Sequence, residues 1–182
     1  MSEAGRFLIP RRLETDRLLL RPFVNDDWRA LHEHFADPEC TRYTFRRALT
    51  EAASWRAMAS MAGHWDLRGY GPYAVEEKAT GTVLGTVGPW YPLEWPEPEI
   101  KWALARRHQG NGYASEAVRA VQRMAHECLP DLALISLIDR QNAPSIRLAL
   151  AVGATLEREL EFAGGPFHLY RHPARLAAGR IA

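Results

Sequence analysis

The sequence predicts an α/β chain in which helices are layered on a mixed, mostly antiparallel sheet. Two observations predict this fold. Alternating apolar runs joined by a glycine turn indicate antiparallel hairpins, and a long amphipathic helix lies between two apolar runs. A strand-helix-strand unit of that kind forms a right-handed parallel crossover. We expect about seven strands and about four helices, in the order β-α-α-β-β-β-α-β-α-β-β.

The first part of the chain is expected to hold one strand and two helices. Residues 16–21, Asp-Arg-Leu-Leu-Leu-Arg, form the strand. Asn25 can cap the first helix, whose apolar face stops before Asp37-Pro38. Thr50 caps the second helix, which we expect to end near Gly63.

The middle of the chain changes to the period of a strand. Tyr73–Glu76 and Val83–Val87 form an antiparallel hairpin around a turn at Lys78–Gly81. Residues 88–98 are rich in proline and aromatic side chains, so we expect a loop there.

The second half of the chain alternates strands with helices. Its amphipathic helix has an apolar stripe at helical spacing. The apolar run that follows lies between two aspartates, as in a strand buried on both faces. The expected elements are a strand at 100–104, a helix at 112–128, a strand at 132–138, a helix at 144–152, and strands at 155–162 and 167–171.

No repeat, low-complexity tract or linker divides the 182 residues. We therefore expect one domain over residues 1–182, with a core at about 14–172 and a tail at 173–182. The chain has no apolar stretch of about 18 residues that would span a membrane. Residues 1–14 lack the apolar centre of a signal peptide, which predicts a cytoplasmic protein.

The charge balance argues against nucleic acid as a partner. The formal net charge is +1, from 23 basic and 22 acidic residues. A nucleic-acid-binding protein usually has a strong basic excess, because neutralising phosphates supplies most of its affinity. Cys40 and Cys128 are too few for a disulfide framework or a zinc site, and no metal is expected. A monomer and a homodimer both remain open.

The segment with the most chemical information is Arg107-His108-Gln109-Gly110-Asn111-Gly112, directly before the amphipathic helix. A helix N-terminus presents unpaired N–H groups and the positive end of the dipole. Glycines in front of it let a phosphate approach the backbone. The pattern therefore predicts pyrophosphate binding, although two glycines by themselves also suit a simple tight turn.

The same segment matches the (Q/R)-x-x-G-x-(G/A) acetyl-CoA signature of the GNAT N-acetyltransferase superfamily. Four further segments resemble, in order, the branch with the ribosomal-protein N-terminal acetyltransferases (RimJ/RimL type). They are Glu14–Arg21, Glu99-Ile-Lys-Trp102, Gly112–Ala117, and Asn142-Ala-Pro-Ser145 followed by Gly153-Ala154. Lys101 departs from the usual glycine, and Ala154 from the usual aromatic residue. The resemblance runs from about Glu14 to Phe162.

The resemblance implies a sheet whose central parallel strands splay apart to hold acetyl-CoA. The strand before the turn would hold the pantetheine arm through its backbone, and the N–H groups of the turn would hold the pyrophosphate. The residues implied in cofactor binding are Trp102, Ala103, Leu104, Arg107, His108, Gln109, Gly110, Asn111, Gly112, Tyr113, Ala114, Asn142 and Ser145.

The implied reaction is attack of a neutral amine on the thioester carbonyl. Glu99 is the first candidate base, acting through water, with Glu159 and Glu161 as weaker ones. A residue after Pro-Glu-Pro also suits a solvent-facing position, so both interpretations of Glu99 stay open. The N–H of Trp102 is a candidate to polarise the carbonyl.

The residue that protonates the leaving thiolate is less clear from the resemblance. Many superfamily members use a tyrosine, and the matching position here is Ala149. Ser145 is the alternative partner for the sulfur. Asn142 and Ser145 also suit a purely structural role in capping the helix.

The acceptor pocket is expected where aromatic residues gather in loops. The candidate wall residues are Arg42, Tyr43, Phe45, Trp90, Tyr91 and Trp95. They also suit a cover for the core of the sheet. Loops carry specificity more often than scaffolds do, which favours the pocket. The acceptor itself is left as a protein N-terminus or a small amine.

Two other functions compete with the acetyltransferase. A nicotinamide-dependent oxidoreductase would use Gly110 and Gly112, but Ser115 stands in place of the third glycine of its fingerprint. A non-catalytic acyl-CoA-binding or regulatory domain would keep the fold without the activity.

Overall fold

The computed structural model describes residues 7–174, so part of the expected tail, residues 175–182, lies outside the described residues. Its sheet has eight strands in the order β1-β2-β3-β4-β5-β6-β8-β7. The neighbours β5 and β6 are parallel, and the other described pairs are antiparallel. The strands are β1 (Leu13–Glu14), β2 (Leu18–Arg21), β3 (Tyr73–Glu77), β4 (Val83–Trp90), β5 (Glu99–Leu104), β6 (Ile135–Asp139), β7 (Thr155–Phe162) and β8 (Gly165–Arg171).

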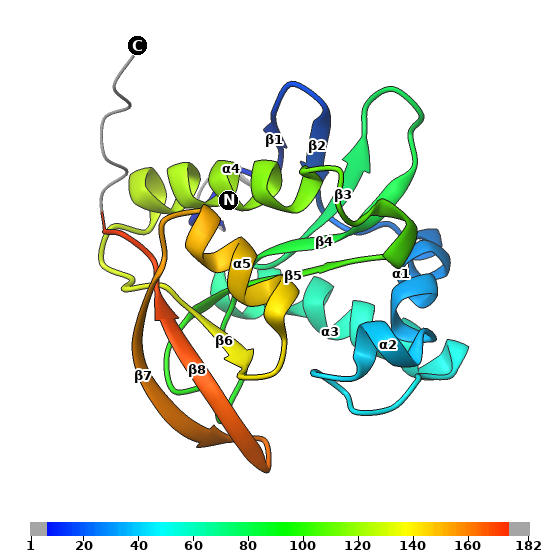
Figure 1. Cartoon of the computed structure of the whole chain (residues 1–182). Helices are drawn as coiled ribbons and strands as arrows, with labels where there is room; N and C mark the ends of the chain where they lie inside the picture. Colours follow the sequence, from blue (N-terminus) through cyan, green and yellow to red (C-terminus); the bar gives the residue numbers. More distant parts are fainter. Residues whose placement is uncertain (1–6, 175–182) are drawn as a thin grey trace.

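The helices cover both faces of this sheet. α4 lies across one face and α3 across the other, with α1 and α2 beside α3 (Figure 1). α5 lies next to α4 and against β6. The helices are α1 (Trp28–Phe35), α2 (Pro38–Thr41), α3 (Glu51–Arg68), α4 (Tyr113–Cys128) and α5 (Ala143–Ala151), with 3₁₀ turns at Asn25–Asp27 and Arg106–His108. The predicted layered fold is confirmed.

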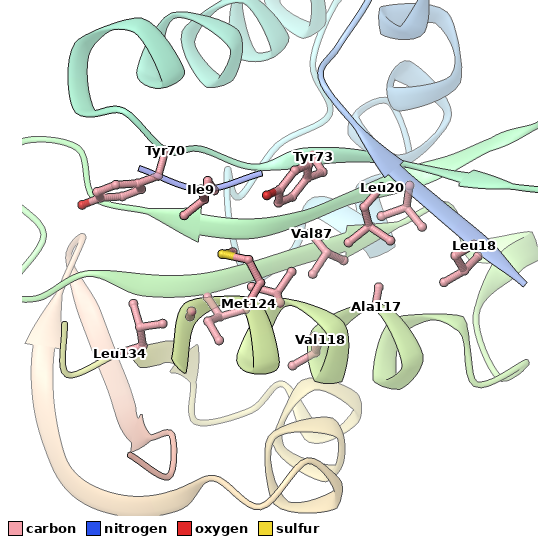
Figure 2. Packing of buried hydrophobic residues seen from close by; sticks show 14 of the residues in the cluster. Ile9, Leu18, Leu20, Tyr70, Tyr73, Val87, Ala117, Val118, Met124 and Leu134 are labelled. Atoms are coloured by element: carbon pink, nitrogen blue, oxygen red, sulfur yellow. The ribbon is translucent and has the colours of Figure 1, made fainter. Parts of the chain in front are cut away.

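The main core fills the space between α4 and the sheet (Figure 2). The apolar stripe of α4 meets strand residues that point to the same face. Burying one such side chain stabilises the fold by about 1.5–3 kcal/mol, so this layer fixes α4 firmly against β4 and β5. Its fully buried members include Leu18, Leu20, Val87, Ile100, Ala117, Val118 and Val121.

A second core lies on the other face, under α1 and α3. It contains Leu31, Phe35, Leu49, Met58 and Met61. The N–H of Leu49 donates to the carbonyl of Phe35 at 2.8 Å, which ties the end of the loop after α2 to α1. No helix among residues 7–174 is long and apolar enough to cross a membrane.

The prediction that the second helix ends near Gly63 is wrong. α3 continues to Arg68 and ends at Gly69, whose φ of 76° gives the left-handed C-cap. Gly63 lies in the helix interior, where a Cβ would meet no atom within 4 Å. A glycine there costs helix propensity but does not stop the helix.

Other boundaries also differ from the sequence prediction. Asn25 does not cap the first helix, because it lies in a 3₁₀ turn and α1 has no side-chain cap. Residues 88–90 belong to β4 and not to a loop, because they pair with residues 99–101 of β5. The strand expected from residue 132 begins at Ile135, since the N–H of Leu132 donates to the carbonyl of Leu129 in a turn. α1 ends at Phe35, and Pro38 is the first residue of a further helix, α2. The sequence prediction contained neither α2 nor β1. Asp37 caps α2 by accepting the N–H of Glu39 at 2.9 Å.

Candidate active site

The centre of the sheet opens between β5 and β6. These parallel strands share one register pair, Glu99 with Ile135, whereas β4 and β5 share six. Two side chains replace ladder hydrogen bonds at the point of separation. The hydroxyl of Ser136 donates to the carbonyl of Ile100 at 2.7 Å, and the N–H of Leu137 donates to Glu99 Oε2 at 3.2 Å. The opening is therefore stabilised by its own polar groups.

The opening leads into a cleft with a volume of about 1100 Å³. Its walls are β5, β6, the first turns of α4 and α5, the loop after α2 and the β7–β8 hairpin. The sequence-predicted residues that line it are Tyr43, Phe45, Trp90, Trp95, Glu99, Trp102, Ala103, Leu104, His108, Gln109, Gly110, Gly112, Tyr113, Ala114, Asn142 and Ser145.

Four of the expected site residues lie outside the lining of the cleft. The guanidinium of Arg107 pairs with Glu33 at 3.0 Å. Tyr91 lies under the guanidinium of Arg68, 4.7 Å from the ring centroid. The other two are Arg42, whose guanidinium lies 3.7 Å from Glu39, and Asn111, whose amide donates to the carbonyl of Gln109 at 3.2 Å.

The glycine turn lies at one end of the cleft, directly before α4. Gly110 and Gly112 have φ values of 79° and 78°, in the left-handed region that favours glycine. A Cβ on Gly110 would meet no atom within 4 Å, so the space in front of it is open. Gly112 is the N-cap of α4 and provides no side-chain cap, which leaves the first N–H groups of the helix available for a ligand.

Arg17 supports this turn from the β1–β2 hairpin, and sequence analysis missed it. Its guanidinium donates to the carbonyl of Asn111 at 3.0 Å and pairs with Glu116 at 2.7 Å. It also lies over the ring of Tyr113, 4.5 Å from the centroid. The contacts join residues about 95 positions apart in the chain, so no local motif would reveal them.

The open glycine turn has the groups that an anion such as a pyrophosphate requires. The backbone donors and the helix dipole both favour an anion at this point, and Arg17 holds the turn in place. Arg106 lies in the preceding 3₁₀ turn, where Asp37 holds it with two hydrogen bonds of 2.7 and 2.6 Å.

The carboxyl group of Glu99 lies at the point where the strands separate. The residue is 7% exposed, so the solvent-facing interpretation is wrong. Oε1 accepts the indole N–H of Trp95 at 2.9 Å, and Oε2 accepts the N–H of Leu137. Burial raises the pKa of Glu99 above its ordinary value, against the effect of these two donors. A carboxyl group in this state takes up a proton more readily than a surface glutamate.

Lys101 also lines the cleft and lies on the same face of β5 as Glu99. Its ammonium is 3.3 Å from the sulfur of Met61 and 5.1 Å from the ring centroid of Trp90. Burial lowers the pKa of Lys101, while the charge of Glu99 acts in the opposite direction. The sequence marked Lys101 as a departure from the resembling strand but assigned it no role.

Ser145 and Trp102 face each other across the cleft from α5 and β5. The indole N–H of Trp102 donates to Ser145 Oγ at 3.2 Å. That bond uses the oxygen as an acceptor and leaves the hydroxyl proton free to be donated elsewhere. Asn142 caps α5 by accepting the N–H of Ser145 at 3.2 Å, so the expected capping role of Asn142 is confirmed.

Ala149, the position matched to the tyrosine of many superfamily members, points away from the cleft. It is fully buried against Ile138 and Tyr170. One turn after Ser145, Leu148 lines the cleft. The side chains of α5 that line the cleft therefore include no tyrosine.

Aromatic side chains form the opposite end of the cleft. The rings of Phe35 and Phe45 meet edge to face at 5.5 Å, and those of Trp95 and Phe162 at 5.0 Å. Arg46 reaches across from the loop after α2 to Asp139 at the end of β6, with 3.9 Å between guanidinium and carboxylate. These contacts join the α2 loop, the β4–β5 loop and the β7–β8 hairpin around one chamber.

A buried hydrogen-bond chain supports the opening from behind, and no local motif in the sequence predicts it. Gln122 of α4 is 2.9 Å from His172 Nδ1, and His172 Nε2 is 2.9 Å from the hydroxyl of Ser136. Because that hydroxyl donates to Ile100, the histidine is neutral with its proton on Nε2. Burial lowers the pKa of His172 to about 4, which preserves the neutral form.

Comparisons with known proteins agree with this geometry. Residues 17–155 match the family described as Acetyltransferase (GNAT) domain. The chain is 32% identical to the uncharacterized N-acetyltransferase p20 of Bacillus licheniformis, over 75% of this chain and 78% of that protein. It is also 32% identical to the uncharacterized protein YkkB of Bacillus subtilis (strain 168), over 87% and 94% of the two chains.

Solved structures give the same result. An acetyltransferase from Agrobacterium tumefaciens str. C58 superposes with a TM-score of 0.80 at 30% identity, over 91% of this chain and 95% of that one. A ribosomal-protein-S5-alanine acetyltransferase from Vibrio fischeri superposes with a TM-score of 0.69 at 16% identity, over 88% and 94%. At that identity, the second likeness shows the fold alone.

Proposed function

The chain belongs to the acetyltransferase (GNAT) domain family, and on this premise we propose that it transfers an acetyl group from acetyl-CoA to a primary amine. One observation carries the proposal. The cleft at the opening between β5 and β6 is lined both by the glycine turn before α4, whose first N–H groups have no side-chain cap, and by the buried carboxyl group of Glu99. Acetyl-CoA, when bound, supplies an acetyl group that its thioester activates for attack by an amine.

The chain's backbone provides the cofactor contacts in this proposal. The N–H groups of the glycine turn from Gly110 and of the first turn of α4 bind the pyrophosphate, and Arg17 holds the turn through the carbonyl of Asn111. The edge of β5 that faces the opening, at residues 102–104, binds the pantetheine arm. A strand edge without a partner has the donors and acceptors that an amide-containing arm requires.

Glu99 acts as the general base. Its raised pKa suits a group that must accept a proton from the acceptor amine, directly or through one water. The two donors on its oxygens hold the carboxylate in a fixed position at the mouth of the opening. Such a base contributes on the order of 10²–10⁴ to the rate.

Ser145 donates its free hydroxyl proton to the sulfur that leaves and takes up a proton from solvent in its place, and Trp102 orients the hydroxyl through its indole. The backbone N–H of Trp102 polarises the thioester carbonyl. The acceptor enters from the aromatic end, between Tyr43, Phe45 and Trp95. A protein N-terminus and a small amine are the two acceptor types that this proposal covers.

The test is free-thiol release from acetyl-CoA with a panel of amines and peptides, together with mass spectrometry of the product. We expect one free thiol to be released for each N-acetylated product molecule. Glu99→Gln should lose this activity. Glu127→Gln is the matched control, because Glu127 is an exposed carboxylate on α4. Intact acetyl-CoA binding without thiol release over the whole panel would contradict the proposal and favour a non-catalytic acyl-CoA-binding domain.

The oxidoreductase alternative requires a doubly wound parallel sheet. The described sheet has one parallel pair among its neighbours. Thermal stabilisation by NAD but not by acetyl-CoA would revive that alternative against the proposal.

A further inference from the structure

Lys101 lies at the centre of the cleft, and no carboxylate of residues 7–174 is within 4 Å of its side-chain nitrogen. That nitrogen lies 3.3 Å from the thioether of Met61. The face of Trp90 covers another side, and that indole is itself stacked on His64 at 4.8 Å. Burial lowers the pKa of Lys101, and the charge of Glu99 acts in the opposite direction. An anion bound beside this nitrogen would favour its charged form further.

The neighbouring titratable groups form no ion pair with Lys101. His34 Nδ1 donates to the carbonyl of Leu104, and His64 donates to the carbonyl of Tyr70 and accepts the N–H of Tyr91. Burial lowers the pKa of both histidines, so both are neutral at neutral pH. Glu99 has both of its oxygens engaged, by Trp95 and Leu137.

Lys101 and Glu99 present opposite charges along one strand. They are two residues apart on the same face of β5, so their Cα atoms are about 7 Å apart. A compact acceptor with an amine and a carboxylate matches this arrangement, with its amine toward Glu99 and its carboxylate toward Lys101. A protein N-terminus has no carboxylate close to its amine, and a simple amine has none at all.

We propose that Lys101 binds the carboxylate of the acceptor and that the acceptor is therefore a free amino acid. This inference rests on the proposed acetyltransferase function. The amino-acid nitrogen forms a bond to the acetyl carbon while the C–S bond breaks. The proton lost by the nitrogen passes to Glu99 and then to solvent, and CoA leaves as the thiol. The product is an N-acetyl amino acid.

The experiment compares acceptors that share a side chain and differ at the carboxylate. Phenylalanine, phenylalaninamide, phenethylamine and a short peptide with N-terminal phenylalanine are assayed by thiol release, and the series is repeated with the other standard amino acids. We expect the best acid to exceed its amide by at least about tenfold in kcat/KM, mainly through KM. The α-amine of phenylalaninamide is less basic than that of phenylalanine and is thus more often neutral. The fraction of neutral amine alone would therefore favour the amide.

Two variants assign the preference to this side chain. Lys101→Met is expected to abolish the preference for the acid over the amide. The chain has one other lysine, Lys78, which pairs with Glu14 at 2.9 Å at the surface. Lys78→Met is thus a matched control and is expected to keep the preference. Should Lys101→Met not fold, the four-acceptor comparison on the unaltered protein still decides.

Three outcomes would overturn the inference. Equal kcat/KM for the acid, the amide and the simple amine would contradict a carboxylate subsite at Lys101, while the proposed acetyltransferase function would still hold. If kcat/KM fell equally for all acceptors in Lys101→Met and the pH–rate profile changed, Lys101 would be a proton-transfer group and not a carboxylate-binding one. No thiol release with any amine would contradict the proposed function itself, and this inference with it.

Discussion

The two ends of the cleft present different chemical groups. At the α4 end these groups come from the backbone, where the space before Gly110 is open and Gly112 provides no side-chain cap. At the other end they come from side chains, namely Glu99, Lys101 and aromatic rings from three separate loops. A backbone site needs small residues at fixed positions, so it leaves a short motif in the sequence. A side-chain site assembled from distant segments leaves none.

The largest expected effect lies at the side-chain end. Glu99→Gln should lower kcat on the order of 10³-fold, or about 4 kcal/mol, because the amide cannot accept the proton. The acidic limb of the pH–rate profile should lie above the ordinary glutamate range, since burial raises the pKa of Glu99. That limb should vanish in the variant. An unchanged kcat would show that the base is another group.

The amide of this variant has one acceptor oxygen for two donors, Trp95 and Leu137. We therefore expect a loss of unfolding free energy of about 1 kcal/mol, measured by urea denaturation. A much larger loss would mean that the drop in kcat reports misfolding and not chemistry.

The next effect concerns the support behind the opening. His172 has a pKa of about 4 in the folded protein and an ordinary value of 6.5 when unfolded. Between these values the unfolded chain takes up a proton that the folded chain does not. The contribution of His172 to the free energy of unfolding should therefore be fully present above pH 6.5 and decrease by about 3 kcal/mol as the pH drops to 4. Urea denaturation across this range measures the loss.

Other histidines contribute to the same slope, and a variant separates them. The pKa values of His34 and His64 are also lowered by burial. The difference between the unaltered protein and His172→Asn isolates His172. Equal slopes in the two proteins would contradict the neutral hydrogen-bond chain from Gln122 to Ser136.

A smaller effect tests the backbone end. Gly112→Val should weaken acetyl-CoA binding by tenfold or more, because the added side chain crowds the proposed phosphate site and its Cβ would lie 3.4 Å from the guanidinium of Arg17. Gly81→Val is the matched control. Gly81 has a similar φ of 70° in the β3–β4 turn, away from the cleft, so its variant should lose stability and keep its affinity.

The smallest effect concerns the serine of α5. Ser145→Ala removes the proposed proton donor to the sulfur and should lower kcat by roughly fivefold, the equivalent of about 1 kcal/mol. The cap of α5 should persist, because Asn142 accepts the backbone N–H of residue 145 and not its hydroxyl. A loss of helix stability with unchanged kcat would assign Ser145 a structural role alone.

The fold was predictable from the sequence because its main signals are local. The α4 stripe, the β3–β4 hairpin and the glycine turn each lie within one segment, and all three are in the structure. The end of α3 was not predictable from Gly63, because one glycine in a long helix is tolerated when packing on either side holds the helix.

The candidate site was predictable at its backbone end and less so elsewhere. The burial of Glu99 depends on the separation of β5 from β6, which no periodicity encodes. Arg17 reaches the turn from the opposite edge of the sheet, and His172 meets Gln122 across the core. The partners in these contacts are each far apart in the chain, so only the folded structure brings them together.

The cofactor placement is tested most directly by calorimetric titration of acetyl-CoA into the unaltered protein, Gly112→Val and Glu99→Gln under identical conditions. We expect an affinity at least tenfold weaker in Gly112→Val and unchanged in Glu99→Gln, because the first residue lies at the proposed pyrophosphate turn and the second at the proposed acceptor end. Unchanged affinity in a folded Gly112→Val variant would contradict the placement of the cofactor.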